Sequence, residues 1–297
     1  MALTINNNLM AYNAQRNLGA SYNMLATSVR RLSSGLRVGT AADDAAGLAI
    51  RELMRAEIAA LNQGVRNAND AISMIQTADG ALQVSDEKLI RMKELAEQAA
   101  TGTYNSDQRL MIESEYQAMA SEITRIANST RFNGVYLLNG NLSSDSHDGS
   151  GLTSTGKLKV HFGPSNDCSE DYYYIRIGNS TASALGLGNQ GYAGRAGFAI
   201  STQSAAQAAL DAIELAIISK DKIRAALGAL QNRLENTVSV LQIQAENIQA
   251  AEAQISDVDV STEMTQFVRS QILTQAGVAM LAQANSIPRM ALQLMQG

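Results

Sequence analysis

A long heptad pattern limits this chain to few folds. Over residues 223–255, apolar or neutral residues recur at alternating spacings of four and three, and a second row covers 54–89, where Asp79 and Asp86 interrupt it. Such spacing predicts long α-helices that pack as a left-handed coiled coil. We expect the seam of this coiled coil to contain Ile58, Leu61, Val65, Ile72, Leu227, Leu234, Leu241 and Ile248.

Helix-breaking residues divide this pattern into separate helices. The segment TGTYNSD at 101–107 ends the first long helix, and helical spacing resumes over about 106–128. A bend is expected over ISDVDVSTEM at 255–264, where Asp257, Asp259 and Ser261 offer a fresh N-cap. The last helix is expected over about 262–286, because Pro288 cannot donate the backbone hydrogen bond that continues a helix.

The composition changes between the helical halves, over residues 138–200. KLKVHFG at 157–163 and DYYYIRIG at 171–178 alternate sides as strands do, with a turn between them. The sequence therefore predicts a mainly α fold. It is a long antiparallel helical bundle or coiled coil, with a small β-hairpin region inserted mid-chain.

Both ends of the chain differ from the middle in charge. Residues 1–42 contain four Arg and no acid, residues 264–297 contain two Arg and no acid, and all 28 acidic residues lie between them. Asp43 and Asp44 mark this change and fit the N-terminus of the helix that follows, where carboxylates cap free N–H groups and oppose the helix dipole.

An isolated terminal helix of this kind is marginal in water, because fixing each residue's backbone costs about 1–2 kcal/mol. A transit peptide or membrane-surface helix has a similar N-terminus, yet neither explains the matching C-terminus. We expect the two ends to pair and to become ordered on assembly; packing within the monomer's own bundle is the alternative. The expected self-assembly core is Leu9, Leu18, Leu25, Leu32, Phe267, Ile272 and Leu281.

Signals for catalysis are poor. The chain has two His, His147 and His161, and one Cys, Cys168, and contains no HExxH, CxxC, GxSxG or P-loop pattern. GLGNQG at 186–191 lacks the strand and helix that a dinucleotide fingerprint needs. We expect no enzyme activity, cofactor, metal, nucleic-acid binding or membrane insertion. A loop rich in Ser offers candidate O-glycosylation sites at Ser143, Ser144, Ser146 and Ser150.

Several segments, in order along the chain, closely resemble the bacterial flagellin family. They are LSSGLRVGTAADDAAGLAI at 32–50, RNANDAISMIQTADGAL at 66–82, RIANSTRFNGVYLL at 125–138 and SQILTQAGVAMLAQANSIP at 270–288. The resemblance covers both conserved blocks of that family, about 1–140 and 200–297. It implies a structural subunit that polymerises into the flagellar filament for swimming motility. The alternative is a hook–filament junction protein, which shares these ends.

The family fold implies a division of the chain into two domains. Residues 1–42 and 256–297 resemble the terminal coiled coil that lines the filament core, the inner domain D0. Residues 43–255 resemble the helical bundle D1, with the hairpin region 138–200, and the outer domains D2 and D3 have no counterpart.

The resemblance also implies partners and a location. It implies unfolded export by the flagellar type III apparatus to the extracellular filament, an export chaperone on the C-terminal segment, and contact with hook-associated and cap proteins. Some flagellins are recognised by an innate immune receptor, and the matching positions here are Arg91, Leu95, Gln98 and Glu115.

Overall fold

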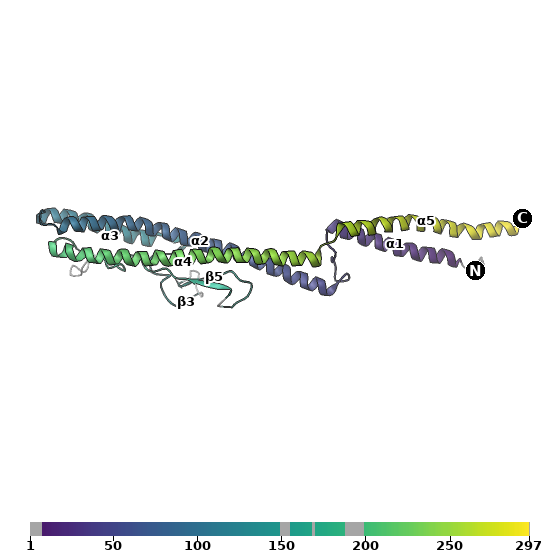
Figure 1. Cartoon of the computed structure of the whole chain (residues 1–297), viewed down its shortest axis with the longest axis horizontal. Coiled ribbons are helices and arrows are strands. Elements are labelled where there is room, and N and C mark those ends of the chain that lie inside the picture. Colours follow the sequence, from purple (N-terminus) through teal and green to yellow (C-terminus); the bar gives the residue numbers. More distant parts are fainter. Residues whose placement is uncertain (1–7, 149–154, 168–169, 188–198, 297) are drawn as a thin grey trace. The chain divides into compact units, whose positions relative to one another are not determined.

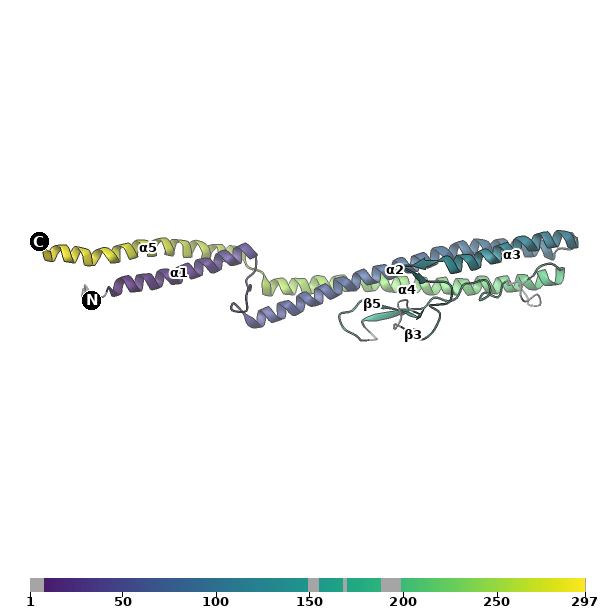
Figure 2. The same cartoon turned by 180° about the vertical axis from the view of Figure 1, so that it is seen from behind.

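A computed structural model describes residues 8–148, 155–167, 170–187 and 199–296. Contacts divide the chain into two compact units (Figures 1 and 2). The first, called here the terminal unit, is Met1–Ile58 with Glu246–Gly297, and the second, the central unit, is Ala59–Ala245. The terminal unit extends further along the two long helices than the residues 1–42 and 256–297 expected for the inner domain.

Two helices from opposite ends of the chain form the terminal unit's main contact. Helix α1 (Leu9–Ser34) lies beside helix α5 (Val260–Gln296) (Figure 1). The side chain of Asn8 caps α1 by accepting from Ala11 N–H at 3.2 Å. Gly35 ends the helix with φ +73°, a left-handed conformation that glycine adopts without steric cost. The expected cap Asp259 is confirmed, since its carboxylate accepts from the N–H groups of Ser261 and Thr262.

The predicted end of the last helix near residue 286 is wrong, because α5 continues with Pro288 inside it. Proline has no N–H, so the carbonyl of Ala284, four residues earlier, loses its usual helical donor. Asn8 from the other end of the chain supplies a replacement, since its Nδ2 donates to Ala284 O at 2.7 Å. One side chain therefore caps α1 and satisfies the acceptor that Pro288 leaves free.

Three helices build most of the central unit. Helix α2 (Ala45–Ala100) and helix α4 (Gln203–Ser256) carry the two heptad rows, and helix α3 (Ser106–Ser129) packs along α2. Asn105 begins α3 with a capping box, in which its side chain and that of Gln108 each accept from the other's backbone. The central unit has two hydrophobic clusters. Their buried residues include Leu82, Leu89, Met92, Tyr116, Ile123, Ile213, Leu227 and Leu234.

The polar interruptions of the first heptad row are paired across the helices. Asp79 accepts from Arg224 on α4 at 2.7 Å, and Asp86 pairs with Lys220. Lys220 is only 1% exposed and also lies 2.9 Å from Asp221. These pairs favour one alignment of α2 and α4, because a shift by one turn would separate Arg224 from Asp79 and buried Lys220 from Asp86, leaving Lys220 only Asp221 on its own helix.

The sequence predicted one hairpin, and the described residues contain three. β5 (Leu158–His161) pairs antiparallel with β6 (Tyr172–Ile175), as expected, while β3 (His147–Asp148) pairs with β4 (Thr155–Gly156). β1 (Arg131–Phe132) and β2 (Val135–Tyr136) form a further hairpin. Its turn is Asn133–Gly134, with φ +47° and +83°, and this dipeptide is a strong hairpin signal that the sequence reading missed.

The β5–β6 hairpin packs closely on α2. Gly64 of α2 is buried against the carbonyl of Phe162, which a Cβ at position 64 would overlap. Asn67, one turn later, donates to His161 O at 2.8 Å. On α4, the guanidinium of Arg233 stacks on the ring of Tyr173 at 3.6 Å. The hairpin is therefore held to both long helices.

Candidate assembly surface

The fully buried positions of the seam between α1 and α5 hold mostly small and polar side chains, and half-buried apolar residues alternate with them. On α1 the only buried residues are Ser21 and Ser28. The described buried residues of α5 are also mostly small or polar: Glu263, Ser270, Thr274 and Ala284. Small residues let two helix backbones approach, but they bury little apolar area. The pair therefore gains little hydrophobic stabilisation from its own interface.

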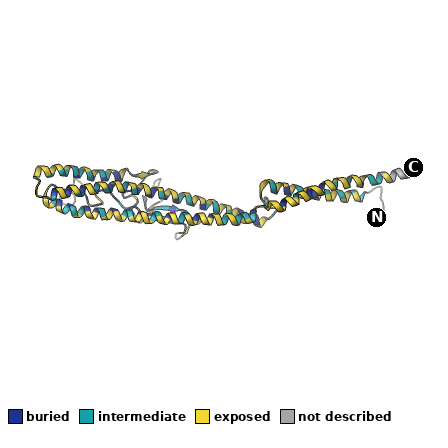
Figure 3. Ribbon diagram, turned by 45° about the horizontal axis from the view of Figure 1, so that its top comes forward, coloured by how far each residue is buried: buried dark blue, intermediate teal, exposed yellow. Residues whose placement is uncertain are grey.

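Many large apolar side chains of both helices are exposed, and Figure 3 shows exposed residues, in yellow, along both helices. Tyr12 is 68% exposed and Met280 is 64% exposed. The others on these helices that are classed as exposed are Leu9, Met10, Tyr22, Met24, Val29, Val260, Met264, Val268, Ile272, Leu273, Val278 and Met290. A surface this rich in apolar side chains, on two packed helices, is typical of an interface with other molecules. We call it the terminal apolar surface.

The residues expected in the self-assembly core fall in two groups. Leu9 and Ile272 are exposed on the terminal apolar surface. The other five are half-buried along the helix pair: Leu18, Leu25, Leu32, Phe267 and Leu281. A cavity of about 460 Å³ between α1 and α5 is lined by Leu18, Leu273 and residues of both helices around them. These residues thus have area left to bury when another molecule packs on the pair.

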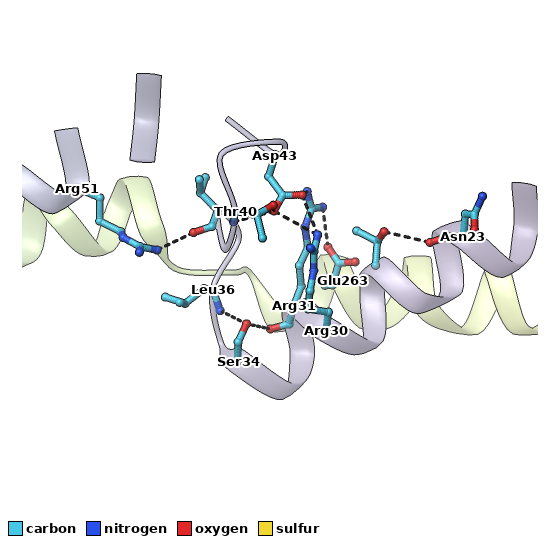
Figure 4. A network of polar contacts seen from close by, with 11 residues as sticks. Asn23, Arg30, Arg31, Ser34, Leu36, Thr40, Asp43, Arg51 and Glu263 are labelled. Carbon is cyan, nitrogen blue, oxygen red and sulfur yellow. Dashed lines mark hydrogen bonds and ion pairs between the residues drawn. The ribbon is translucent and has the colours of Figure 1, made fainter. Parts of the chain in front are cut away.

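A polar network ties the chain together where α1 ends and α5 begins (Figure 4). Arg30 pairs with Asp43 at 2.8 Å. Arg31 lies 3.9 Å from the same carboxylate and 3.6 Å from Glu263 on α5. Asp43 also accepts from the hydroxyl and N–H of Thr40. The hydroxyl hydrogen bond is the main cause that lowers the pKa of Asp43, with help from the two arginines.

The two aspartates at the start of α2 therefore have different roles. Asp44 caps the helix as expected, because its Oδ1 accepts from Gly47 N–H at 2.9 Å. Asp43 does not cap it, and this part of the prediction is wrong. Its carboxylate turns toward Thr40 and the arginines of α1 because their charge and donors outcompete the free N–H groups of α2.

Backbone contacts fix the connection between α1 and α2. Arg37 N–H donates to Ser256 O at 2.7 Å, and Val258 N–H donates to Gly35 O at 3.0 Å. This short bridge links the chain just after α1 with the end of α4. Arg51, largely buried, donates from Nη1 to Val38 O at 2.6 Å. The connection is thus held by backbone hydrogen bonds near the end of α4 and by a charged hydrogen bond from Arg51 of α2.

The residues predicted for the coiled-coil seam all lie on the inner sides of α2 and α4 or at their margins. Leu61, Leu227, Leu234 and Leu241 are buried. The other four are half-buried: Ile58, Val65, Ile72 and Ile248.

The four positions matching the receptor patch do not form one exposed surface. Arg91 donates to Glu115 and Glu94 at 2.9 Å each. These hydrogen bonds raise the pKa of Arg91, and the bond to Glu94 has the larger effect. Gln98 donates to the Tyr104 hydroxyl at 3.0 Å. Leu95 is only 2% exposed and belongs to the core. Any partner would therefore contact the polar members of this set.

The candidate glycosylation sites lie in the loop before β3. Ser144 and Ser146 are exposed and hydrogen-bond each other, while Ser143 is half-buried and donates to Gly140 O. Ser150 and Cys168 lie outside the described residues.

The part of the chain that the structure describes shows no obvious site for chemistry. No three His, Cys, Asp or Glu side chains in it gather as metal ligands would. Among its helices none is both long and apolar enough to cross a bilayer. Among the described residues, the terminal apolar surface is consequently the strongest candidate for a functional site.

Comparisons with known proteins show which family models and relatives this chain resembles. The family models "Bacterial flagellin N-terminal helical region" and "Bacterial flagellin C-terminal helical region" match residues 5–143 and 210–295. The flagellar filament 33 kDa core protein of Treponema phagedenis is 40% identical over 294 residues, which cover 99% of this chain and all of that protein. A flagellin of Halalkalibacterium halodurans is also 40% identical over 294 residues, with the same coverage.

A solved structure described as a flagellar hook-associated protein of Vibrio parahaemolyticus matches with a TM-score of 0.55 and 14% identity. The match covers 72% of this chain and all of that one. At this identity the likeness concerns the fold alone.

Proposed function

This chain belongs to the bacterial flagellin family and is a structural subunit of the flagellar filament, and on that premise we propose that it polymerises through its terminal apolar surface. The observation that carries the proposal is the arrangement of α1 and α5. The fully buried positions of their seam are small or polar, and the large apolar side chains of both helices are half-buried beside them or exposed. Packing against other subunits would bury those side chains at about 25 cal/mol for each Å² removed from water.

The charge pattern supports the same surface. After Glu263 the chain contains no acidic residue, and none precedes Asp43. Glu263 itself lies near Arg31 at the start of α5. A carboxylate buried without a partner costs several kcal/mol, so a surface destined for burial in a polymer excludes it. The acid-free ends are thus explained by assembly.

Single acidic substitutions test this assignment. We expect Leu32→Asp or Leu281→Asp to prevent seeded elongation while the central unit melts as in the wild type. Leu281→Met, which conserves volume and apolar character, is the matched control and should elongate normally. Normal filaments from either Asp variant would refute the role of the terminal helices, because an unpaired carboxylate could not be tolerated in the proposed interface.

The family's domain scheme assigns each part of the chain to a domain of the filament subunit. In this proposal residues 1–42 and 256–297 form the inner domain D0 and line the filament core. Residues 43–255 form D1, which includes the region 138–200, and D2 and D3 are lacking. We also infer that the protein is structural only and has no enzymatic activity or cofactor.

Export to the extracellular filament belongs to the same proposal. The C-terminal segment would bind a dedicated export chaperone before secretion, because its apolar side chains need cover until the subunit packs into the filament. A peptide of residues 260–297 should compete with the full chain for that chaperone, whereas a peptide of 203–245 should not. Culture medium from a strain lacking the export apparatus should contain no subunit.

Contacts with hook-associated and cap proteins follow from a filament that begins at a hook and grows at its tip. A strain lacking the cap protein should release this chain into the medium as monomer. Filaments growing without the cap would exclude that dependence.

Recognition by an innate immune receptor is proposed for the polar members of the patch, Arg91, Gln98 and Glu115. A receptor-reporter assay with monomer should lose signal on Arg91→Ala. Silence of the wild type at saturating dose would rule out recognition.

O-linked glycosylation is proposed for the loop serines. The intact mass of purified filaments should exceed the sequence mass if Ser143, Ser144, Ser146 or Ser150 carries O-linked sugar.

The hook–filament junction protein remains the alternative considered from sequence, and it is not favoured. The relatives that match nearly all of this chain are named flagellin or flagellar filament core protein. A junction protein would be present in few copies and would not elongate into long filaments.

A further inference from the structure

The methionines of this chain are distributed unevenly between its two units. In the central unit Met74 and Met92 are buried in the core, and Met111 on α3 is exposed. In the terminal unit five methionines are exposed on α1 and α5: Met10, Met24, Met264, Met280 and Met290. Exposed thioethers are open to oxidants, whereas buried ones are protected. Oxidant-sensitive side chains are therefore concentrated on the terminal apolar surface.

Two of these residues, one from each end of the chain, lie at the same cavity. Met10 on α1 and Met280 on α5 both line the cavity of about 460 Å³ between the helices, together with Leu18, Leu273 and Ile287. Met10 is 52% exposed and Met280 is 64% exposed, so solvent reaches both side chains. An added oxygen at either sulfur would lie beside apolar neighbours.

We propose that Met10 and Met280 form a reversible oxidation site that controls whether a subunit can assemble. The proposal rests on assembly through the terminal apolar surface. The modifying reagent is a two-electron oxidant of the peroxide class. The peroxide transfers one oxygen atom to the thioether sulfur, so an S–O bond forms as the O–O bond breaks. The sulfur loses two electrons, and hydrogen peroxide leaves as water. In the reverse step, a methionine sulfoxide reductase uses a dithiol as the two-electron reductant: the dithiol is oxidised to a disulfide, and the sulfoxide oxygen leaves as water.

The modification changes the property on which assembly depends. Methionine sulfoxide is polar, and its oxygen needs a hydrogen-bond donor when it is removed from water. In a free subunit, water supplies that donor. In the interface proposed here, most side chains around the cavity are apolar, and the donors are Asn13, Asn17, Ser21 and Gln283, which must serve the sulfoxide in place of water. Oxidation thus penalises the polymer and leaves the free subunit almost unaffected.

Polymerisation should in turn protect the site, because the surface that carries it becomes covered. Oxidation then acts on subunits before assembly and spares those already in filaments. Reduction by a methionine sulfoxide reductase restores the thioether and, with it, the ability to assemble.

The test is seeded elongation of full-length monomer before and after mild hydrogen peroxide treatment, with oxidation at each methionine followed by peptide mass spectrometry. Oxidation at Met10 and Met280 should raise the critical concentration about tenfold, the effect expected for one unsatisfied buried polar group. Treatment with methionine sulfoxide reductase should reverse the change. Elongation that is unchanged despite full oxidation at both residues would overturn the proposal.

A double variant provides the matched control. Met10→Leu with Met280→Leu conserves volume closely and should elongate with or without peroxide. Met111→Leu, at an exposed position on α3, should remain as sensitive as the wild type. Sensitivity retained by the double variant would refute these two residues as the site. If the untreated wild type does not elongate, assembly through these helices fails, and this inference fails with it.

Discussion

The hydrogen bond from Asn8 to Ala284 can be isolated by a substitution that keeps the helix cap. Serine is as good an N-cap as asparagine, so Asn8→Ser retains an acceptor for Ala11 N–H. Its shorter side chain cannot provide the amide donor that lies 2.7 Å from Ala284 O. The lost bond leaves the acceptor freed by Pro288 without a partner, at a cost of about 1 kcal/mol.

The cost should depend on residue 288. In a Pro288→Ala chain, the N–H of residue 288 can donate to Ala284 O, so Asn8→Ser should be nearly neutral there. The double-mutant cycle removes the separate effect of proline on helix propensity. A coupling of about 1 kcal/mol corresponds to about a fivefold change in critical concentration.

Critical concentrations of the four chains, measured by sedimentation after seeded growth, give the coupling directly. Asn8→Ser should raise the critical concentration about fivefold in the proline chain and hardly at all in the alanine chain. An equal effect of Asn8→Ser in both chains would show that Asn8 does not compensate for Pro288.

Three further predictions concern single positions. Gly64→Ala should lower the melting temperature of the chain, because the new Cβ overlaps the β5–β6 hairpin, whereas Gly80→Ala on the same helix, with open space around it, should stabilise it by about 1 kcal/mol. Asp86→Asn should cost about 3 kcal/mol in urea unfolding because it weakens the charge pairing of buried Lys220, and adding Lys220→Met should recover part of the loss. The lowered pKa of Asp43 means that its contribution to stability is present above the unfolded pKa of about 3.9 and is lost as pH falls through the folded value. Hydrogen exchange after residue 35 should therefore be faster in Asp43→Asn than in the wild type at pH 7, and the difference should shrink at strongly acidic pH; equal rates at pH 7 would contradict it.

The heptad rows were sufficient to predict the helices and their antiparallel pairing, because apolar periodicity specifies which face of each helix is buried. They did not reveal the partners of Asp79 and Asp86. Which residue pairs with which across two helices depends on their axial register. The spacing within one helix gives no information about that register. Arg224 and Lys220 were therefore visible only once α2 and α4 were aligned.

Local rules failed where a distant residue intervened. Pro288 predicts a helix end by its own chemistry, and only a contact with Asn8, 276 positions away in sequence, explains why α5 continues. Asp43 looked like a helix cap until the arginines of α1 were brought beside it. The Asn133–Gly134 turn differs from these cases, since its signal was present in the sequence.

The outward orientation of the terminal side chains could be predicted only in part. Acid-free ends indicated burial in an assembly. The structure places Ser21 and Ser28 at the buried positions of the seam between the two helices, with Leu25 half-buried between them. Helical spacing alone does not say which of two amphipathic stripes faces the partner helix and which faces another molecule.

The most direct measurement of the central claim is seeded polymerisation of purified chain, followed by light scattering and electron microscopy, beside a variant that lacks residues 1–35 and 265–297. Assembly through the terminal helices predicts long filaments from the full chain and none from the truncated chain, although the truncated chain retains the helical circular dichroism of its central unit. Filaments from both chains would contradict the account and assign assembly to the central unit.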